Sequence, residues 1–152
     1  MDKKKFLKEE FTKLLATLQP DLQGKWGKMN AQQMVEHMSF AVRWANGRIA
    51  TKPVHAPEIT QRLYQFMVSE KPFKENTPNQ LLSDDPYAWK NTSMAAAITE
   101  LQLELDTFFK VYADKEDLRI LNPFFGNLNF ADQVQLLHKH ATHHARQFGL
   151  VE

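Results

Sequence analysis

The chain of 152 residues fits one domain, residues 1–152, and is long enough to bury a hydrophobic core. Hydrophobic residues make up 43% and charged residues 24%, and the formal net charge of +1 gives no electrostatic basis for binding nucleic acid. No apolar run approaches the roughly 20 residues that span a bilayer, and no cysteine can form a disulfide or a thiolate ligand. The basic N-terminus lacks a following hydrophobic region, so we expect a cytoplasmic protein with no nucleic-acid or membrane partner.

The first predicted helix begins after Asp2, which can cap it, and extends to about Leu18. Pro20 and Gly24 end it. Its apolar residues recur at helical spacing and form one stripe, which we expect to pack in the core: Phe6, Leu7, Phe11, Leu14, Leu15 and Leu18.

The second predicted helix begins with Asn30, which stands in capping-box register with Gln33. It extends from Ala31 to about Asn46 and stops at Gly47. His37 lies on an apolar stripe of this helix together with Met34, Ala41 and Trp44. A single histidine on such a stripe is usually a hydrogen-bonded core residue, so its role as a ligand depends on donors from elsewhere.

Five prolines punctuate the chain between residues 48 and 91, which is too short and too poor in core residues for a second domain. Within this crossover, Pro57 to about Val68 predicts a short helix whose apolar side carries Ile59, Leu63, Phe66 and Met67. Long crossovers in compact domains often line a functional site.

A third long helix is predicted from near Asn91–Ser93 to about Asp114, with several competing caps. The last helix follows Asn129 as its cap, extends from Phe130 to Phe148 and stops at Gly149. No segment shows the sustained alternation of a strand. We therefore predict an all-α four-helix bundle with a long crossover, containing the short helix, between its second and third helices.

The last helix carries four of the six histidines within residues 138–144. His140 and His144 are four residues apart and share a helix face, a spacing that suits two imidazoles on one metal ion. His138 and His143 point to opposite flanks, and we expect them to be dispensable. Two ligands do not close a site, and bundles build metal sites from facing helices, so His37 is the candidate third ligand. The alternative is a pair that only packs or makes hydrogen bonds.

Two segments resemble a known family. Residues 26–38, which include Trp26, Gly27 and His37, look like the second-helix signature of the DinB-like superfamily, and more closely of a bacterial branch of uncharacterised DinB-related domains. Residues 122–126 and 136–147 are similar to the end of the same branch. The resemblance spans nearly the whole chain in order, and the two histidine segments are its most specific parts.

The resemblance implies a four-helix bundle in up-down-down-up order, a homodimer, and a divalent metal, zinc or nickel. By position the ligands are His37, His140 and His144. His143 and Gln147 match the family pattern as neighbours of the second helical ligand, and we expect Gln147 to orient a ligand or a bound water. Characterised relatives include transferases that act on low-molecular-weight thiols and maleylpyruvate isomerase. The family implies no DNA binding.

Three neutral imidazoles leave the charge of a metal ion uncancelled and one position open, as in catalytic zinc sites. Such a site acidifies a bound water or thiol. We therefore expect a metal-dependent enzyme with a small-molecule substrate, a thiol transferase before other classes. A metal-dependent hydrolase, a non-catalytic metal or small-molecule binding module, and a metal-free bundle remain as alternatives. No acid or base residue stands out, and the crossover does not reveal which of its residues would line a site.

Overall fold

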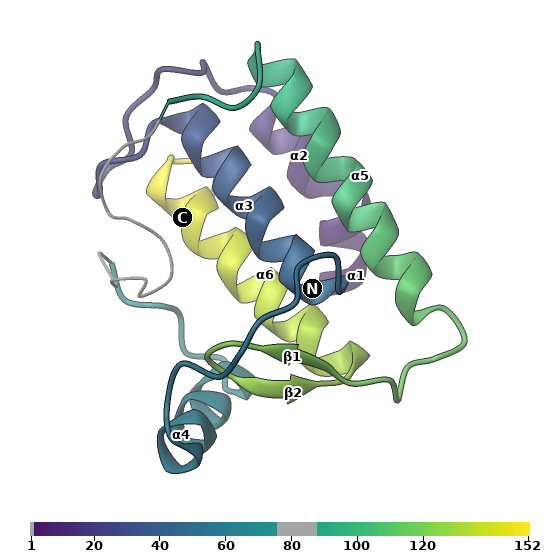
Figure 1. Cartoon of the computed structure of the whole chain (residues 1–152). Helices are drawn as coiled ribbons and strands as arrows, with labels where there is room; N and C mark the ends of the chain where they lie inside the picture. The colour runs from purple at the N-terminus through teal and green to yellow at the C-terminus, as the bar shows by residue number, and fades with distance from the viewer. Residues whose placement is uncertain (1, 76–87) are drawn as a thin grey trace.

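The computed structural model describes residues 2–75 and 88–152, and within them the fold is mostly helical with one small sheet. In chain order the elements are α1 (Lys3–Lys5), the π-helical turn η1 (Phe6–Glu10), α2 (Phe11–Leu15), α3 (Ala31–Ala45), α4 (Pro57–Val68), α5 (Met94–Tyr112), β1 (Ile120–Asn122), β2 (Gly126–Leu128) and α6 (Phe130–Gln147). Helix α3 lies between α5 and α6, and the N-terminal helical segment packs against α5 and α6 (Figure 1). The predominantly helical prediction is confirmed. In the described part of the chain, no helix is both long and apolar enough to cross a membrane.

The N-terminal helix differs from its prediction in two ways. It ends at Leu15 rather than near Leu18, and one π-helical turn interrupts it, closed by the bond from the Phe11 N–H to the Phe6 carbonyl. In a regular α-helix, residues five apart point about 140° away from each other. The wider π turn brings Phe6 and Phe11 onto one side, where their rings stack with centroids 5.7 Å apart and both are buried.

The caps of the long helices follow the sequence closely. Asn30 and Gln33 form the predicted reciprocal capping box at α3, and Asn129 accepts the Asp132 N–H at the start of α6. Ser93 is the cap of α5, selected from the three candidates. Helix α4 has the predicted bounds, with Pro57 in its first turn.

The main hydrophobic core lies between the N-terminal helix, α3, α5 and α6. Its largest fully buried members include Phe11, Met34, Leu101, Phe108 and Leu137. A second cluster joins α4, β2 and α6 through Met67, Leu128 and Leu136. The two clusters hold α6 from opposite sides, so the histidine-rich helix is positioned by packing on more than one face.

The sheet was not predicted. Strands β1 and β2 pair antiparallel with Ile120 opposite Leu128 and Asn122 opposite Gly126. The Asn122 side chain accepts the N–H groups of Phe124 and Phe125 and closes the turn, and Gly126 adopts φ +90°. Three residues per strand are too few for an alternating pattern to appear in the sequence.

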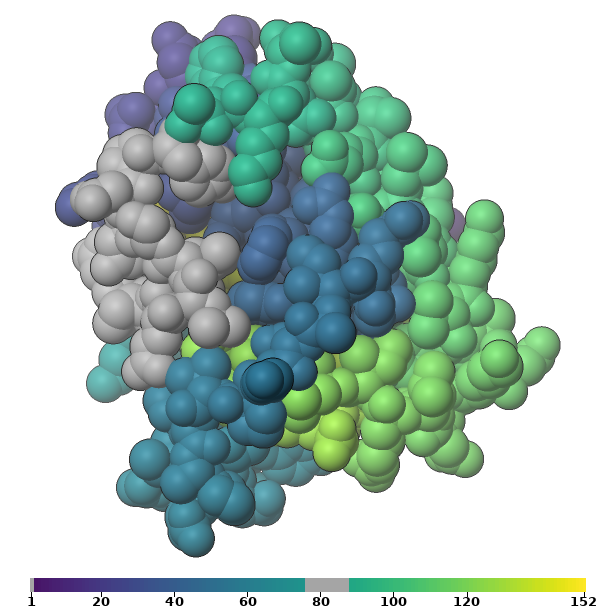
Figure 2. Space-filling view, in the orientation of Figure 1, coloured from purple at the N-terminus to yellow at the C-terminus, as the bar shows by residue number. Residues whose placement is uncertain are grey.

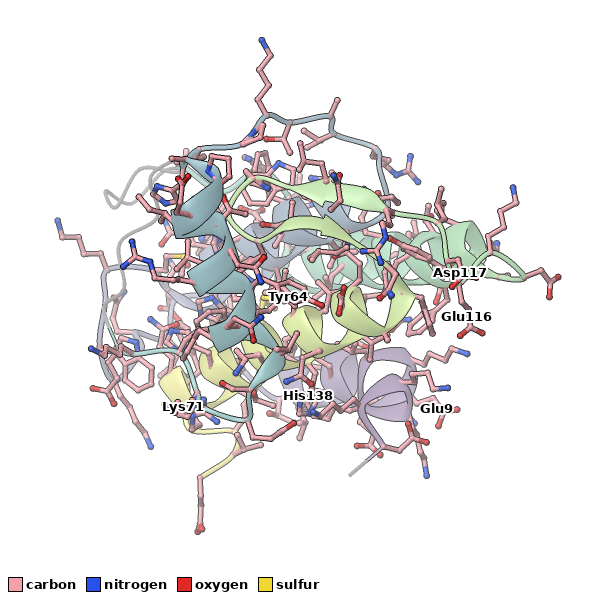
Figure 3. All side chains as sticks on the ribbon, turned by 90° about the horizontal axis from the view of Figure 1, so that it is seen from below. Glu9, Tyr64, Lys71, Glu116, Asp117 and His138 are labelled. Carbon is pink, nitrogen blue, oxygen red and sulfur yellow. The ribbon has the colours of Figure 1, made fainter. Side chains whose placement is uncertain are left out.

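Helix α4 forms a lobe at the lower end of the molecule (Figures 1 and 2), where it packs against α6 and β2. Seen from below, Tyr64 projects from α4 toward α6 (Figure 3), where its hydroxyl donates to Asp132 Oδ1 at 3.1 Å. The polar clusters around Pro78 and Pro86, which mark the predicted crossover, lie outside the described residues.

Candidate metal centre

His37 faces the least buried side of α3. Every residue from Ala31 to Ser39 is buried except His37, which keeps partial exposure. Other segments therefore bury this half of α3 on nearly every side, and not only along the predicted apolar stripe that includes His37. The histidine lies at the edge of the core and is partly exposed.

His140 and His144 face His37 from α6. Nε2 of His140 lies 3.0 Å from Nε2 of His37 and 2.9 Å from Nε2 of His144. The three residues offer ligand nitrogens that all lie within 4.8 Å of one another. Tetrahedral bonds of zinc to nitrogen place neighbouring ligand atoms roughly 3.3 Å apart, so the two short separations are close to those of one shared ion. The three histidines are positioned to hold a metal ion.

Gln147 fixes the tautomer of His144. Its side-chain oxygen Oε1 lies 2.6 Å from Nδ1 of His144, one turn earlier on α6. An amide oxygen only accepts hydrogen bonds, so Nδ1 carries the hydrogen. The lone pair of neutral His144 is then on Nε2, which faces His140 and His37.

The three imidazoles can all pair with one bound cation, whereas they cannot all form hydrogen bonds with one another. With neutral rings, a single hydrogen on His140 Nε2 can satisfy only one of its two short contacts with His37 and His144. A cation at the meeting point would pair with the lone pairs of all three. Because the described residues around the cluster add no carboxylate to the group, the ligand set consists of imidazoles only.

Burial keeps the three rings neutral. It lowers the pKa of His37 to about 4, with a smaller contribution from the charge of His143. Burial also lowers the pKa values of His140 and His144 well below the ordinary range, and the neighbouring histidines add to the shift. Neutral imidazole is the form that binds metal, so these shifts keep the cluster competent at neutral pH.

The two flanking histidines differ from the prediction that both face outward. His143 is only 8% exposed, and its ring packs against those of Trp26 and His144 with centroid separations of 5.5 and 5.0 Å. His138 is half-buried, with its ring edge-on to Phe6 at 5.3 Å (Figure 3). Segments distant in sequence cover both flanks of α6, which a single-helix projection does not reveal. Neither histidine belongs to the three that converge.

Other polar candidates are engaged elsewhere. Arg43 and Arg48 both bind the buried carboxylate of Glu104, at 2.8 and 2.7 Å.

The sequence did not predict a role for Phe73, whose ring lies edge-on to those of His140 and His143 with centroid separations of 6.2 and 5.9 Å. Phe73 lies in the crossover, where helical periodicity gives no signal.

An open hollow of about 330 Å³ is lined in part by His143, whose ring packs against that of His144. Trp26 and Phe73 contribute aromatic walls, and Lys25 and Arg146 contribute positive charge, while Glu75 and Glu152 also reach its edge. The hollow thus combines apolar surface with charged groups. The side chain of His143 lies between the hollow and His144.

No protein-family model, curated protein or solved structure matches this chain. The resemblance to the DinB-like superfamily therefore stays a prediction, and the chemistry of the centre rests on the geometry of its own residues.

Proposed function

We propose that this chain binds one divalent transition-metal ion through His37, His140 and His144. The convergence of their Nε2 atoms, 2.9 and 3.0 Å apart across two of the three pairs, carries the proposal. The ligands come from α3 and α6, two long helices that pack together, as in metal-binding four-helix bundles. A DinB-like bundle is the architecture that we propose for these helices.

Zinc and nickel are the metals that we propose. Imidazole nitrogen suits zinc, nickel, copper and iron alike, so the choice of zinc and nickel rests on the resemblance to the DinB-like superfamily. Three neutral ligands also leave the metal's charge uncancelled, which is typical of catalytic rather than closed structural sites.

We further propose that the centre transfers a low-molecular-weight thiol to a small electrophile. A bound divalent metal would supply Lewis acidity, which favours the deprotonated form of a thiol at these ligands. The thiol sulfur forms a bond to an electrophilic carbon, the leaving group departs from that carbon with its electron pair, and the thiol proton passes to water. The histidines hold the centre, and Gln147 keeps His144 oriented.

The hollow beside His143 offers charged groups of both signs and apolar surface to a small polar substrate. Lys25 and Arg146 can pair with a carboxylate, and Trp26 and Phe73 can pack against an apolar body. Biological low-molecular-weight thiols carry carboxylate or other polar groups, so this lining suits them better than it suits a long apolar chain.

Metal analysis of the freshly purified full chain, followed by assays with several biological thiols and electrophiles, tests the proposal. We expect about one zinc or nickel per chain and metal-dependent loss of the free thiol. His140→Ala should lose both, whereas His55→Ala, outside the cluster, should keep both. Ester or amide hydrolysis without thiol consumption would replace the transferase with a hydrolase. Stoichiometric metal without turnover would leave a binding module, and a metal-free parent would refute the centre itself.

A further inference from the structure

The backbone of the connector between α2 and α3 forms hydrogen bonds with both helices of the metal centre. Residues 22–27 run from the N-terminus of α3, where the Ala31 N–H donates to the Leu22 carbonyl at 2.9 Å, to the C-terminus of α6. There the Lys25 N–H donates to the Gln147 carbonyl at 2.7 Å. The connector therefore joins the ends of the two helices that carry all three candidate ligands.

The same connector also holds the Gln147 side chain. Gln147 Nε2 donates to the Trp26 carbonyl at 2.9 Å, while Oε1 lies 2.6 Å from His144 Nδ1. A backbone carbonyl only accepts hydrogen bonds, so it requires the NH₂ end of the amide on its side. If the amide turned over, oxygen would face oxygen at Trp26, and the NH₂ group would face His144 Nδ1 and favour the other tautomer. The Trp26 carbonyl thus selects the amide orientation, and the amide orientation selects the tautomer of His144.

Two glycines give the connector room for this contact. A Cβ at Gly24 would lie 2.9 Å from Gln147 Cγ, and a Cβ at Gly27 would lie 2.8 Å from Gln147 Nε2. Both separations are shorter than real side chains tolerate. Gly27 also adopts φ +76°, a conformation that other residues rarely take. At Gly24 no such backbone restriction applies, and the requirement there is close approach to Gln147 and to the Trp26 carbonyl oxygen, which would also lie 2.9 Å from the added Cβ.

We infer that the connector is a positioning element of the metal centre: the Trp26 carbonyl, admitted by Gly24 and Gly27, orients Gln147, which presents His144 to the metal through Nε2. The inference rests on the proposed metal site. Groups that orient metal-ligating histidines typically change metal affinity by about 10–100-fold when removed. The connector contributes no ligand of its own, and its effect on the orientation of His144 passes through Gln147.

Gly24→Ala and Gly47→Ala form a matched pair of substitutions. The first places a methyl group against Gln147. The second strains a glycine at φ +81° whose added Cβ would meet only Ile120 Cδ1 at 3.8 Å, away from the cluster. We expect Gly24→Ala to weaken zinc binding by about tenfold or more, measured by competition with a chromogenic chelator. Gly47→Ala should lower stability and leave zinc affinity within about threefold of the parent chain, because it does not touch the orienting contacts.

A double-mutant cycle separates positioning from general damage. In a Gln147→Ala background the Gly24 methyl group still meets the Trp26 carbonyl oxygen, but that carbonyl no longer orients an amide, so Gly24→Ala should change zinc affinity by less than about threefold. If Gly24→Ala weakened zinc binding as much in that background as in the parent chain, the inference would be overturned. Equal losses of zinc affinity in Gly24→Ala and Gly47→Ala would also overturn it.

The tautomer itself is measurable without metal. Nitrogen-15 NMR of the imidazole rings in the metal-free full chain at pH 7.5 should show His144 protonated at Nδ1. Gly24→Ala should shift it toward a mixture, and so should Gln147→Met, which keeps the volume, removes the acceptor and adds no group at the connector. An unchanged Nδ1–H signal in both variants would overturn the inference. A parent chain that binds no zinc would instead refute the proposed metal site, while the tautomer measurement would still decide the role of the connector.

Discussion

The carboxylate of Glu36 accepts the backbone N–H of Asn91 at 2.8 Å, so the residue before His37 holds the chain that leads into α5. The same carboxylate accepts the Lys90 N–H at 2.9 Å, and Glu36 is only 3% exposed. Glu36 is therefore engaged in structure and points away from the histidine cluster, as its position next to His37 on a helix predicts.

Glu36→Ala should lower the free energy of unfolding by about 2 kcal/mol, because the N–H groups of Lys90 and Asn91 lose their charged acceptor. Urea unfolding at pH 7 measures the change. Glu9→Ala, at an exposed position of the N-terminal helix, should stay within about 0.5 kcal/mol of the parent. Equal midpoints for the two variants would contradict the role given to Glu36.

Lys139 holds the chain that follows α4 against α6. Its ammonium group donates to the carbonyls of Ser69 and Lys71 and lies 4.8 Å from the centre of the Phe66 ring, and the residue is 6% exposed. Lys139→Met keeps the length of the side chain and loses these donors, so we expect the free energy of unfolding to fall by about 1–3 kcal/mol. Urea unfolding of the metal-free chain tests this, with Lys110→Met on the exposed side of α5 as the control. A loss in Lys110→Met as large as that in Lys139→Met would refute the assignment.

The buried histidines make stability depend on pH. The pKa of His37 falls from an ordinary value of 6.5 to about 4 on folding, chiefly by burial. Between these two values the unfolded chain binds more protons than the folded chain, so the free energy of unfolding rises with pH and falls as the pH drops. For the metal-free chain we expect this histidine alone to contribute a loss on the order of 3 kcal/mol between pH 7 and pH 4.

Urea midpoints of the metal-free chain at several pH values measure that loss. His37→Gln removes the titrating group and should flatten the curve between pH 6.5 and pH 4 relative to the parent. An identical curve for the variant would show that protonation of His37 does not oppose folding.

A homodimer remains a prediction from the family resemblance. Light scattering at high protein concentration should give twice the mass of one chain. A monomer mass under those conditions would exclude the dimer without affecting the metal centre, whose three candidate ligands all come from one chain.

The helices were predictable because their signals are local. The capping box of Asn30 with Gln33, the cap at Asn129 and Pro57 at the start of α4 each lie beside the boundary that they mark. The π-helical turn was missed because the prediction assigns Phe6, Leu7 and Phe11 to one stripe of a regular helix, so the pattern gave no signal of the wider turn between Phe6 and Phe11.

The histidine set was predictable in part for the same reason. His140 and His144 share a face through helix geometry alone, and their meeting with His37 required only that α3 and α6 face each other. The burial of His143 was not predictable, because Trp26 and Phe73 reach it from a connector and a crossover that lack periodicity. Contacts made by irregular segments depend on the complete fold.

The most direct test of the metal centre is metal content by mass spectrometry across single histidine variants of the full chain. His37→Ala, His140→Ala and His144→Ala should each lose stoichiometric zinc or nickel, because two imidazoles form a much weaker site than three. His138→Ala should retain the metal of the parent chain, since its ring packs on Phe6 outside the cluster. Full occupancy in His37→Ala, or a loss in His138→Ala equal to that in His144→Ala, would contradict the assignment of these three ligands.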